Sequence, residues 1–361
     1  MKIISLKLDN FRNHLDFQHN FQKNITVFYG PNAIGKTNIL EAIRFLSLPK
    51  SFRAKYEREL INEQAEFARI NGIFRKEEMV DIEIFLSRKD NPKKAIKING
   101  SRKKISDLVG QFFIVLFCPE DLNLISEAPS VRRRYLDIVI SQADKKYYRE
   151  ISELKKVLLN RNKLLLEIKE RGSDTALLEF WNEKLITLSK NIFKKRLYLI
   201  NFINSKISSY VSQIGLRGKR LNIRYKSKLK ELNEKNFEDD FRKKLLAKQG
   251  EEIKRVRTLI GPHRDDFVLK LENKNAAYFA SRGETRGIML ALKLAELDFS
   301  KEIFNIKPVL LLDDIFSELD FEHRKNIVKI ARDQQTIITT TELELIGKDL
   351  VREAEVVKIS Q

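Results

Sequence analysis

The chain has 361 residues, enough for about two domains, and its 69 Lys and Arg outnumber 50 Asp and Glu to give a net charge of +19. This balance indicates a polyanionic partner, either nucleic acid or an acidic membrane face. Cys118 is the single cysteine, which excludes a disulfide framework and a cysteine-rich zinc site. Because the sequence shows neither a signal-peptide pattern nor an apolar run long enough to cross a membrane, we expect a cytoplasmic protein.

A phosphate-binding loop is predicted near the start of the chain, after two strands expected within residues 1–29. Residues 30–37 read GPNAIGKT and match G-x-x-x-x-G-K-[ST], in which backbone N–H groups wrap a phosphate chain. Residues 25–29 have the pattern of a buried strand and 38–46 that of a helix, the order that places phosphates at a helix N-terminus. We expect ATP to be bound by Gly30, Pro31, Asn32, Ala33, Ile34, Gly35, Lys36, Thr37 and Asn38. Lys36 is predicted to be catalytic at the β- and γ-phosphates, and Thr37 to bind Mg²⁺.

Short alternating segments follow the predicted loop and helix. Residues 67–74, 79–86 and 95–98 have the period of strands, and Asn99-Gly100 is a hairpin turn signal. These segments predict an antiparallel sheet beside the nucleotide-binding core. The continuous apolar run 112–118 favours a strand that is buried on both faces.

A helical, basic arm is predicted from residue 131 to residue 257, between two parts of the head at 1–130 and 258–361. Ser130 is expected to cap a long helix that continues past Leu165, and Gly172-Ser173-Asp174 should separate it from a second helix reaching Ile214. Two such helices should pack antiparallel. The arm holds 33 Lys and Arg against 16 Asp and Glu, which is nearly all of the chain's excess charge. We therefore expect it or its flanks to contact DNA phosphates. Its basic clusters are Arg132-Arg133-Arg134, Lys194-Lys195-Arg196, Arg217 with Lys219-Arg220, Arg224 with Lys226, Lys228 and Lys230, and Lys254-Arg255.

A globular pattern returns at Leu259, and one of its strands ends in two carboxylates. Strands are expected at 267–271, 276–279, 309–314, 336–339 and 356–359. Asp313 and Asp314 end the apolar strand that starts at Val309, and the carboxyl edge of such a strand is where a phosphate-loop protein holds Mg²⁺. Asp313 is predicted to orient the metal, and Asp314 to position or deprotonate the attacking water. Because Asp313 lies far downstream of Lys36, the two halves of the site must close around the inserted arm.

A second phosphate-binding element is predicted 32 positions before Asp313, at a helix N-terminus. Ser281 and Glu284 have the spacing of a capping box at the start of a helix that continues through Leu297. We expect the same N-terminus, through Ser281 and Gly283, to bind the γ-phosphate of a nucleotide held by another subunit, and we count Ser281 as catalytic.

These motifs together resemble the ABC-type ATPase head of the SMC class: phosphate loop, S-x-G signature, LLLDD strand and Ser317-Glu318-Leu319-Asp320. Within that class the chain is similar to the RecF family along essentially its whole length, at residues 10–13, 119–137, 261–266 and 311–320. The resemblance implies an α/β fold with a parallel core sheet, an antiparallel sheet and an inserted helical arm.

The resemblance also implies a function. A family member would form an ATP-dependent homodimer, with each nucleotide between the phosphate loop of one subunit and Ser281 of the other. It would bind double-stranded DNA near gaps and act with RecR and RecO to load the RecA recombinase. Arg12 is implied to touch the nucleotide phosphates, and Asp320 to lie near the facing subunit. Because Glu284 stands where many signatures have Gln and Asp314 where transporters have Glu, we expect slow, DNA-stimulated hydrolysis.

Three other functions are weighed against this one. An ATPase subunit of a membrane transporter, or of another ABC-type or SMC-like complex, would share the phosphate loop and signature. However, the basic arm disfavours a transporter. A chromosome-structuring protein would need much longer coiled coils than residues 131–257 provide. His263-Arg264-Asp265 is superficially similar to a kinase catalytic loop, but no D-F-G or β3-lysine pattern accompanies it, so we reject a kinase.

Overall fold

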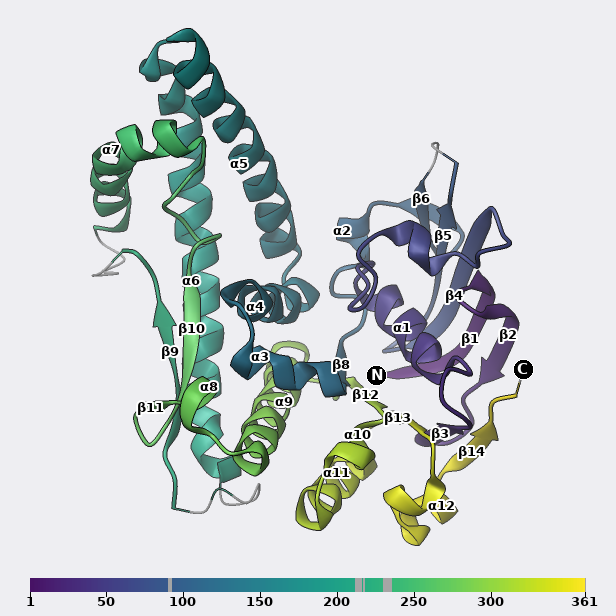
Figure 1. The fold of residues 1–361 in the computed structure, drawn as a ribbon. Helices are drawn as coiled ribbons and strands as arrows, with labels where there is room; N and C mark the ends of the chain where they lie inside the picture. The colour runs from purple at the N-terminus through teal and green to yellow at the C-terminus, as the bar shows by residue number, and fades with distance from the viewer. Residues whose placement is uncertain (90–92, 212–215, 217, 230–235, 361) are drawn as a thin grey trace. The chain divides into compact units, whose positions relative to one another are not determined.

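The fold is described from a computed structural model, which defines residues 1–89, 93–211, 216, 218–229 and 236–360. Contacts divide the chain into two units. We call Met1–Leu122, Ile207–Lys219 and Ser281–Gln361 the head unit, and Asn123–Lys206 and Arg220–Ala280 the arm unit (Figure 1). The arm unit extends beyond the predicted range of 131–257 at its C-terminal end because the strand from Asp266 to Leu271 pairs with Leu221–Lys226. Ile214, Arg217 and Lys230, named in the sequence predictions, lie outside the described residues.

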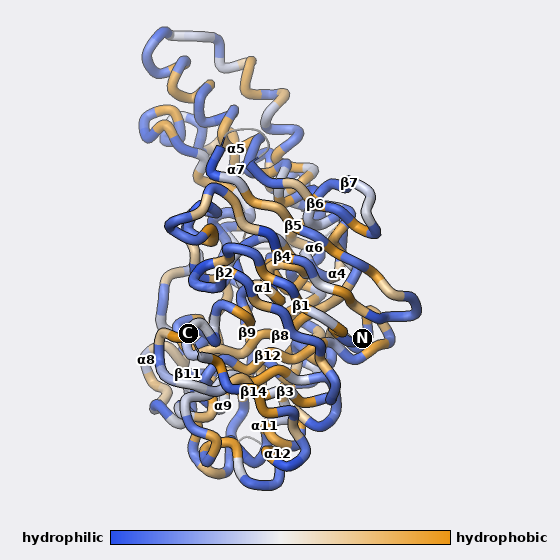
Figure 2. The backbone as a smooth tube through the Cα atoms, turned by 90° about the vertical axis from the view of Figure 1, so that its right-hand side faces the viewer, coloured by the Kyte–Doolittle hydropathy of each residue, from blue (hydrophilic) through white to orange (hydrophobic). Residues whose placement is uncertain are grey.

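A parallel sheet positions the phosphate loop of the head unit. Its strand order is β14-β3-β13-β12-β8, and every neighbouring pair is parallel. The strands are β3 (Ile25–Tyr29), β8 (Ile114–Phe117), β12 (Val309–Asp313), β13 (Thr336–Thr340) and β14 (Glu355–Lys358). Every residue of β8, β12 and β13 is buried, as expected for strands covered on both faces. Figure 2 shows β8 and β12 as hydrophobic stretches of the chain.

A second, antiparallel sheet completes the core of the head unit. Its order is β2-β1-β4-β5-β6-β7. The strands are β1 (Lys2–Phe11), β2 (His14–Asn20), β4 (Phe67–Arg75), β5 (Met79–Ser87), β6 (Lys94–Ile98) and β7 (Ser101–Lys103). Helix α1 (Lys36–Ser47) contacts strands of both sheets, and one hydrophobic cluster joins Ile3, Ile43, Ile70 and Leu311. The predicted pair of sheets is therefore confirmed.

Short helices and one long helix complete the head unit. The long helix is α9 (Arg282–Phe304), which begins at the predicted signature. The others are α2 (Ile105–Leu108), α10 (Ile315–Glu318), α11 (Phe321–Asp333) and α12 (Lys348–Glu353), with 3-10 turns at η1 (Glu57–Leu60), η2 (Pro119–Leu122) and η4 (Leu343–Ile346).

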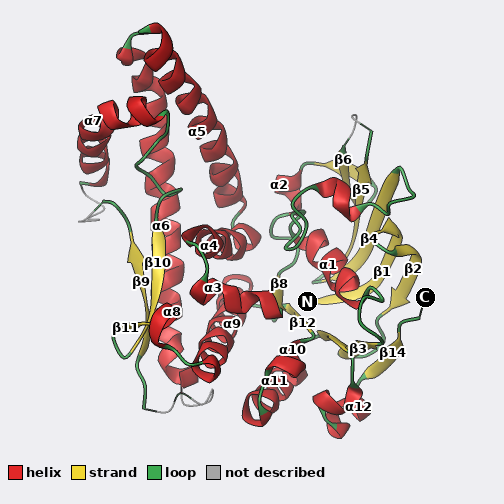
Figure 3. Cartoon of the chain, in the orientation of Figure 1, coloured by secondary structure: helices red, strands yellow, loops and turns green. Residues whose placement is uncertain are grey.

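Long helices dominate the arm unit (Figure 3). They are α4 (Pro129–Ala143), α5 (Lys145–Arg171), α6 (Leu178–Val211, whose last turns belong to the head unit) and α7 (Phe237–Arg255). Helices α5 and α6 are antiparallel, as predicted: Arg161 bonds Asn182, whereas Glu150 bonds Asn191. Shorter elements are α3 (Asn123–Ser126), η3 (Thr175–Leu177), α8 (Ala276–Phe279) and a three-stranded sheet of β9 (Leu221–Lys226), β10 (Asp266–Leu271) and β11 (Lys274–Asn275).

Two local predictions for the arm unit were wrong. The expected single helix from Ser130 is two helices: Pro129 occupies the first turn of α4 after Ala128, and the Asp144 side chain accepts the Tyr147 N–H to start α5. Residues 276–279 form a helix rather than a strand, since the Asn275 side chain caps Ala277 N–H. In both places a local capping bond overrides the apolar pattern.

Candidate functional site

The phosphate loop joins β3 to α1 and requires glycine at two positions. Gly35 is the N-cap of α1 with φ 108°, and Gly30 has φ 157°. A Cβ at Gly35 would lie 2.5 Å from Asn13 Oδ1, and one at Gly30 would lie 2.8 Å from the Ile359 carbonyl oxygen. Neither position tolerates a side chain without movement of its surroundings, so the close turn depends on both glycines.

Lys36 is held against the loop that carries it. Its Nζ donates to the carbonyl oxygens of Gly30 and Pro31, both at 2.7 Å. The pKa of Lys36 is lowered, because the effect of burial outweighs the opposing charges of Asp314 and Asp313. The ammonium group is thus partly desolvated beside two carboxylates, where an anionic ligand would gain from its charge.

Thr37 and Asp313 meet although 276 positions separate them. Thr37 Oγ1 donates to Asp313 Oδ1 at 2.8 Å, and Thr339 Oγ1 from the neighbouring strand donates to the same oxygen at 2.7 Å. Asp313 is 4% exposed, and burial raises its pKa while the two hydroxyl bonds lower it. Hydroxyl and carboxylate oxygens are hard ligands, so this pair fits Mg²⁺.

Asp314 begins the turn after β12 with strained backbone. Its φ is 48°, and its N–H donates to the carbonyl and hydroxyl oxygens of Thr339, both at 3.1 Å. Among the described residues, no group donates a hydrogen bond to its buried Oδ1. Burial raises the pKa of this carboxyl and the charge of Lys36 lowers it. A strained residue with an unsatisfied carboxylate oxygen is typical of a functional position.

A cavity of about 960 Å³ brings most of the predicted nucleotide ligands together. Of the predicted residues, those that line it are Arg12, Asn32, Ala33, Gly35, Lys36, Thr37, Asn38 and Asp314. The lining residue Lys36 donates to the carbonyl oxygens of Gly30 and Pro31, and the lining residue Thr37 donates to Asp313. These three predicted residues therefore contact the cavity wall without lining the cavity themselves. Ile34 instead packs against the hydrophobic core. The volume and the mainly polar wall suit a nucleotide.

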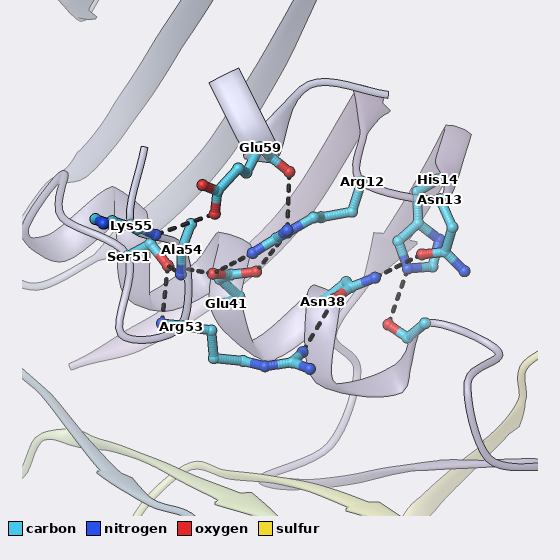
Figure 4. Close-up of polar contacts among 11 residues, drawn as sticks. Arg12, Asn13, His14, Asn38, Glu41, Ser51, Arg53, Ala54, Lys55 and Glu59 are labelled. Carbon is cyan, nitrogen blue, oxygen red and sulfur yellow. Dashed lines mark hydrogen bonds and ion pairs between the residues drawn. The ribbon is translucent and has the colours of Figure 1, made fainter. Parts of the chain in front are cut away.

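Arg12 is oriented by a buried carboxylate that sequence reasoning missed. Glu41 on α1 is fully buried and accepts from Arg12 Nε at 2.9 Å and Nη2 at 3.1 Å (Figure 4). Arg12 Nη1 also donates to the carbonyl oxygen of Glu59 at 2.8 Å, and Ser51 donates its hydroxyl to Glu41. Such bidentate bonds hold a guanidinium in one orientation at the cavity wall.

Further polar side chains surround the predicted ligand Asn38 at the cavity wall. Asn38 donates to Asn13 Oδ1 at 2.7 Å (Figure 4). Asn13 in turn donates to the Ile34 carbonyl at 2.8 Å. His14 Nε2 lies 3.0 Å from the Gly35 carbonyl oxygen, so the start of β2 contacts the phosphate loop directly. Arg53 also lines the cavity and bonds Asn38 Oδ1 at 3.4 Å. Asn38 was predicted from the sequence and Asn13 lies in the family-like stretch 10–13, whereas only proximity in the fold identifies His14 and Arg53.

The predicted signature lies at the start of α9 and does not line this cavity. The capping box is present: Glu284 N–H donates to Ser281 Oγ at 3.3 Å, and Ser281 N–H donates to the Glu284 carboxylate at 2.6 Å. Ser281 and Gly283 are exposed. Lys219 forms an ion pair with Glu284, and that bond, followed by the Ser281 N–H, lowers the pKa of Glu284 to about 2. The signature therefore carries a carboxylate whose charge is balanced within the head unit.

The basic clusters of the arm unit differ in what they offer to a ligand. Arg196, named within one of the predicted basic clusters, is 2% exposed and bonds Asp137, so its guanidinium group is not available to a DNA phosphate. Arg132 is likewise paired, with Asp266 at 2.7 Å. Lys195 is half exposed and paired with Asp144. A basic run in the sequence is therefore not by itself a basic surface.

The chain was compared with known proteins. A family model described as the RecF/RecN/SMC N terminal domain matches residues 2–359. A relative from Lactobacillus johnsonii, named DNA replication and repair protein RecF, is 36% identical over 366 residues, covering 100% of this chain and 98% of the relative.

Two solved structures are similar to nearly the whole chain. The first, described as the recombination mediator protein RecF-ATPrS in the RecFOR pathway, has a TM-score of 0.90 at 34% identity and covers 99% of this chain and 96% of its own. The second, described as RecF-ATP in the same pathway, has a TM-score of 0.88 at 36% identity and covers 95% and 92%.

Proposed function

Because the chain belongs to the RecF family, with the fold of an ABC-type ATPase head of the SMC class, we propose that it is an ATP-dependent DNA-binding protein of recombinational repair. The observation that carries this proposal is the Thr37–Asp313 contact beside Lys36, which joins the phosphate loop to the carboxylate strand. ATP is the expected nucleotide, supported by the relative described as RecF-ATP. Within the described residues, no helix is long and apolar enough to cross a membrane.

The head unit would bind and hydrolyse ATP with residues already in place. Backbone N–H groups of the loop and the Lys36 ammonium would hold the phosphates, with Lys36 exchanging its carbonyl partners for phosphate oxygens. A Mg²⁺ ion held by Thr37 and Asp313 would neutralise phosphate charge when bound. Asp314 would accept a hydrogen bond, and then a proton, from the attacking water through the oxygen that now lacks a donor.

The exposed signature supports a site completed by a second copy of the chain. Ser281 and Gly283 lie at the N-terminus of α9, where N–H groups favour an anion, yet they do not line the cavity of their own head unit. We propose that two copies close on two ATP molecules, each between one phosphate loop and the other Ser281. Hydrolysis would be slow and stimulated by DNA, and it would release the pair.

The closed pair is proposed to hold double-stranded DNA near gaps and, with RecR and RecO, to help load RecA. Support for DNA comes from the charge of residues 131–257, with 33 Lys and Arg against 16 Asp and Glu. The partner proteins come from the family and from the RecFOR pathway named for the two similar structures. Phosphate contacts of this kind need clustered cations but no particular base sequence.

Sedimentation tests the whole proposal. An Asp314→Asn protein, which should bind ATP without hydrolysing it, is compared with the same protein lacking nucleotide, each with and without a gapped duplex. We expect monomers without ATP, dimers with ATP and magnesium, and DNA-bound dimers when duplex is added. A protein that stays monomeric at saturating ATP and binds DNA equally in both states would refute it.

A further inference from the structure

The motif Gly261-Pro262-His263-Arg264-Asp265-Asp266 has no role in the proposed ATPase cycle. It lies in the arm unit between α7 and β10. Its two carboxylates are occupied: Asp266 accepts Arg132 Nε at 2.7 Å and Nη2 at 3.1 Å, and buried Asp265 accepts the Tyr225 hydroxyl at 2.8 Å. Both acids therefore serve to fix neighbouring side chains.

A third carboxylate close to the motif is occupied in the same way. Asp137 accepts Arg196 Nη2 at 2.8 Å and the Tyr147 hydroxyl at 2.5 Å. Arg196 in turn donates to the Pro262 carbonyl at 2.8 Å, which ties the motif to α6. The acids around the motif are thus bonded to arginine and tyrosine side chains.

Three other arginines near the motif have no carboxylate partner among the described residues. Arg133 Nη1 donates to the Asp265 backbone carbonyl at 2.8 Å, and Arg264 donates Nε and Nη2 to the Thr258 carbonyl at 3.2 and 3.1 Å. The side chain of Arg257 is exposed. A guanidinium has five N–H donors, so these carbonyl bonds leave donors for a further acceptor.

The guanidinium group of Arg264 is close enough to those of Arg257 and Arg133 to be repelled by both. Burial, and then the charges of Arg257 and Arg133, lower the pKa of Arg264, and the charge of Glu252 opposes this shift. Burial and then the charge of Arg196 lower the pKa of Arg133, and the charges of Asp266, Asp137 and Asp265 oppose this shift. The buried ring of His263, with a pKa lowered to about 4 mainly by burial, adds no charge at neutral pH. The acids closest to these arginines are bonded to other side chains: Asp266 to Arg132, Asp137 to Arg196, Asp265 to Tyr225 and Glu252 to Arg161. The three guanidinium groups therefore favour the binding of an anion.

The residue before Arg257 has a strained backbone conformation. Helix α7 ends with Val256 at φ 53°, in the left-handed region that a β-branched residue rarely adopts. Val256 N–H donates to the Ile253 carbonyl at 3.2 Å, and Arg257 N–H to the Glu252 carbonyl at 3.0 Å, completing a Schellman turn. Strain that persists where glycine would relieve it is consistent with a fixed position for Arg257.

We propose that Arg133, Arg257 and Arg264 form a phosphate-binding site whose ligand is the backbone of duplex DNA. This inference rests on the proposed function and assigns DNA contact to three residues rather than to the whole basic arm. Phosphate oxygens accept guanidinium N–H groups in paired geometry, and a bound phosphate would offset the repulsion among the three cations. The contact would be independent of base sequence.

Arg257→Gln is the sharpest test, because the side chain is exposed and its loss should not disturb folding. Arg242→Gln is the matched control: it removes the same charge from α7 at a residue outside the basic clusters, where Arg242 is 40% exposed and paired with Glu183 at 2.7 Å. Duplex affinity is measured by fluorescence anisotropy with ATP between 50 and 200 mM NaCl. Loss of one phosphate contact should make the slope of log affinity against log salt less negative by about 0.9. Between 50 and 200 mM NaCl, the affinity of the variant should therefore fall by a factor about 3.5 times smaller than the factor for the wild type.

A second variant separates the possible outcomes. Arg264→Gln should make the same slope less negative, and Arg264→Lys should restore part of it because lysine keeps the charge without the paired geometry. If Arg257→Gln and Arg264→Gln bind duplex with the wild-type affinity and slope, the site is refuted while ATP-dependent DNA binding by the wild type stands. If the wild type binds no duplex in any nucleotide state, the proposed function itself fails, and the DNA ligand with it.

Discussion

Replacing Glu41 with glutamine tests how strongly the head unit depends on one buried carboxylate. Glu41 is fully buried and accepts two bonds from Arg12, at 2.9 and 3.1 Å, and one from Ser51. Glutamine keeps the shape but removes the charge, and its NH₂ group would face one of the guanidinium N–H groups. Arg12 would therefore lose one hydrogen bond and the charge that strengthens the other.

The expected loss is about 2 kcal/mol. A hydrogen bond to a charged group contributes about 1.5–3 kcal/mol. We take the lower part of that range, because Arg12 keeps its bond to the Glu59 carbonyl and its side chain is 22% exposed and can be partly hydrated. For a unit of about 200 residues, a loss of this size lowers Tm by about 4–8 °C.

Thermal unfolding without nucleotide, followed by far-UV circular dichroism, measures this loss. Glu353→Gln is the control, because Glu353 forms a similar paired bond with Arg332 but is 48% exposed, so water screens the pair and its loss should lower Tm much less than the loss of Glu41. Fluorescence of Trp181, the only tryptophan, follows the arm unit in the same samples. Equal Tm shifts for the two variants would contradict the argument that burial makes the Glu41 pair strong.

Three further predictions concern the nucleotide site. Lys36→Ala should abolish ATP binding in equilibrium dialysis, and retained affinity would remove the phosphate-loop interpretation. Ser281→Arg should bind ATP normally but form no ATP-induced dimers on a sizing column, whereas unchanged dimers would exclude the signature from the interface. Asp314→Asn should raise Tm at pH 7, because burial raises the folded-state pKa of Asp314 and its charged form is disfavoured. As the pH falls through this pKa, the wild-type carboxyl becomes protonated and the wild type gains stability, so the Tm values of the two proteins should become equal near pH 4 and below. A Tm difference that does not change with pH would implicate another cause.

The sequence predicted the elements that depend on local patterns. The strand, loop and helix around GPNAIGKT, the apolar strand ending at Asp313 and the capping box at Ser281 each have a signal within a few residues. The meeting of Thr37 with Asp313 also followed, because parallel strands end at one edge of the sheet. These features needed no knowledge of distant contacts.

Features that depend on distant contacts could not be predicted. Glu41 has no sequence sign of burial, since its partner Arg12 comes from a hairpin turn 29 positions earlier. Arg196 belongs to a basic run, but its side chain is buried and forms an ion pair with Asp137, 59 positions away. The turn at Asp144 had a usable signal, a capping side chain, but the apolar spacing continues across it. Charge and periodicity in one segment do not reveal which side chains the fold encloses.

The order of strands in the parallel sheet has a consequence for synthesis of the protein. Strand β3 lies between β13 and β14, which begin at Thr336 and Glu355. A ribosome adds about 5–20 residues per second, so roughly 15–60 s pass between the synthesis of the apolar segment Ile25–Tyr29 and that of β13, the first of its two pairing strands. The arm unit, complete at Ala280, has all its residues before either neighbour of β3 is made. A nascent chain should thus expose an aggregation-prone strand for most of translation, which makes it a substrate for chaperones that bind apolar segments.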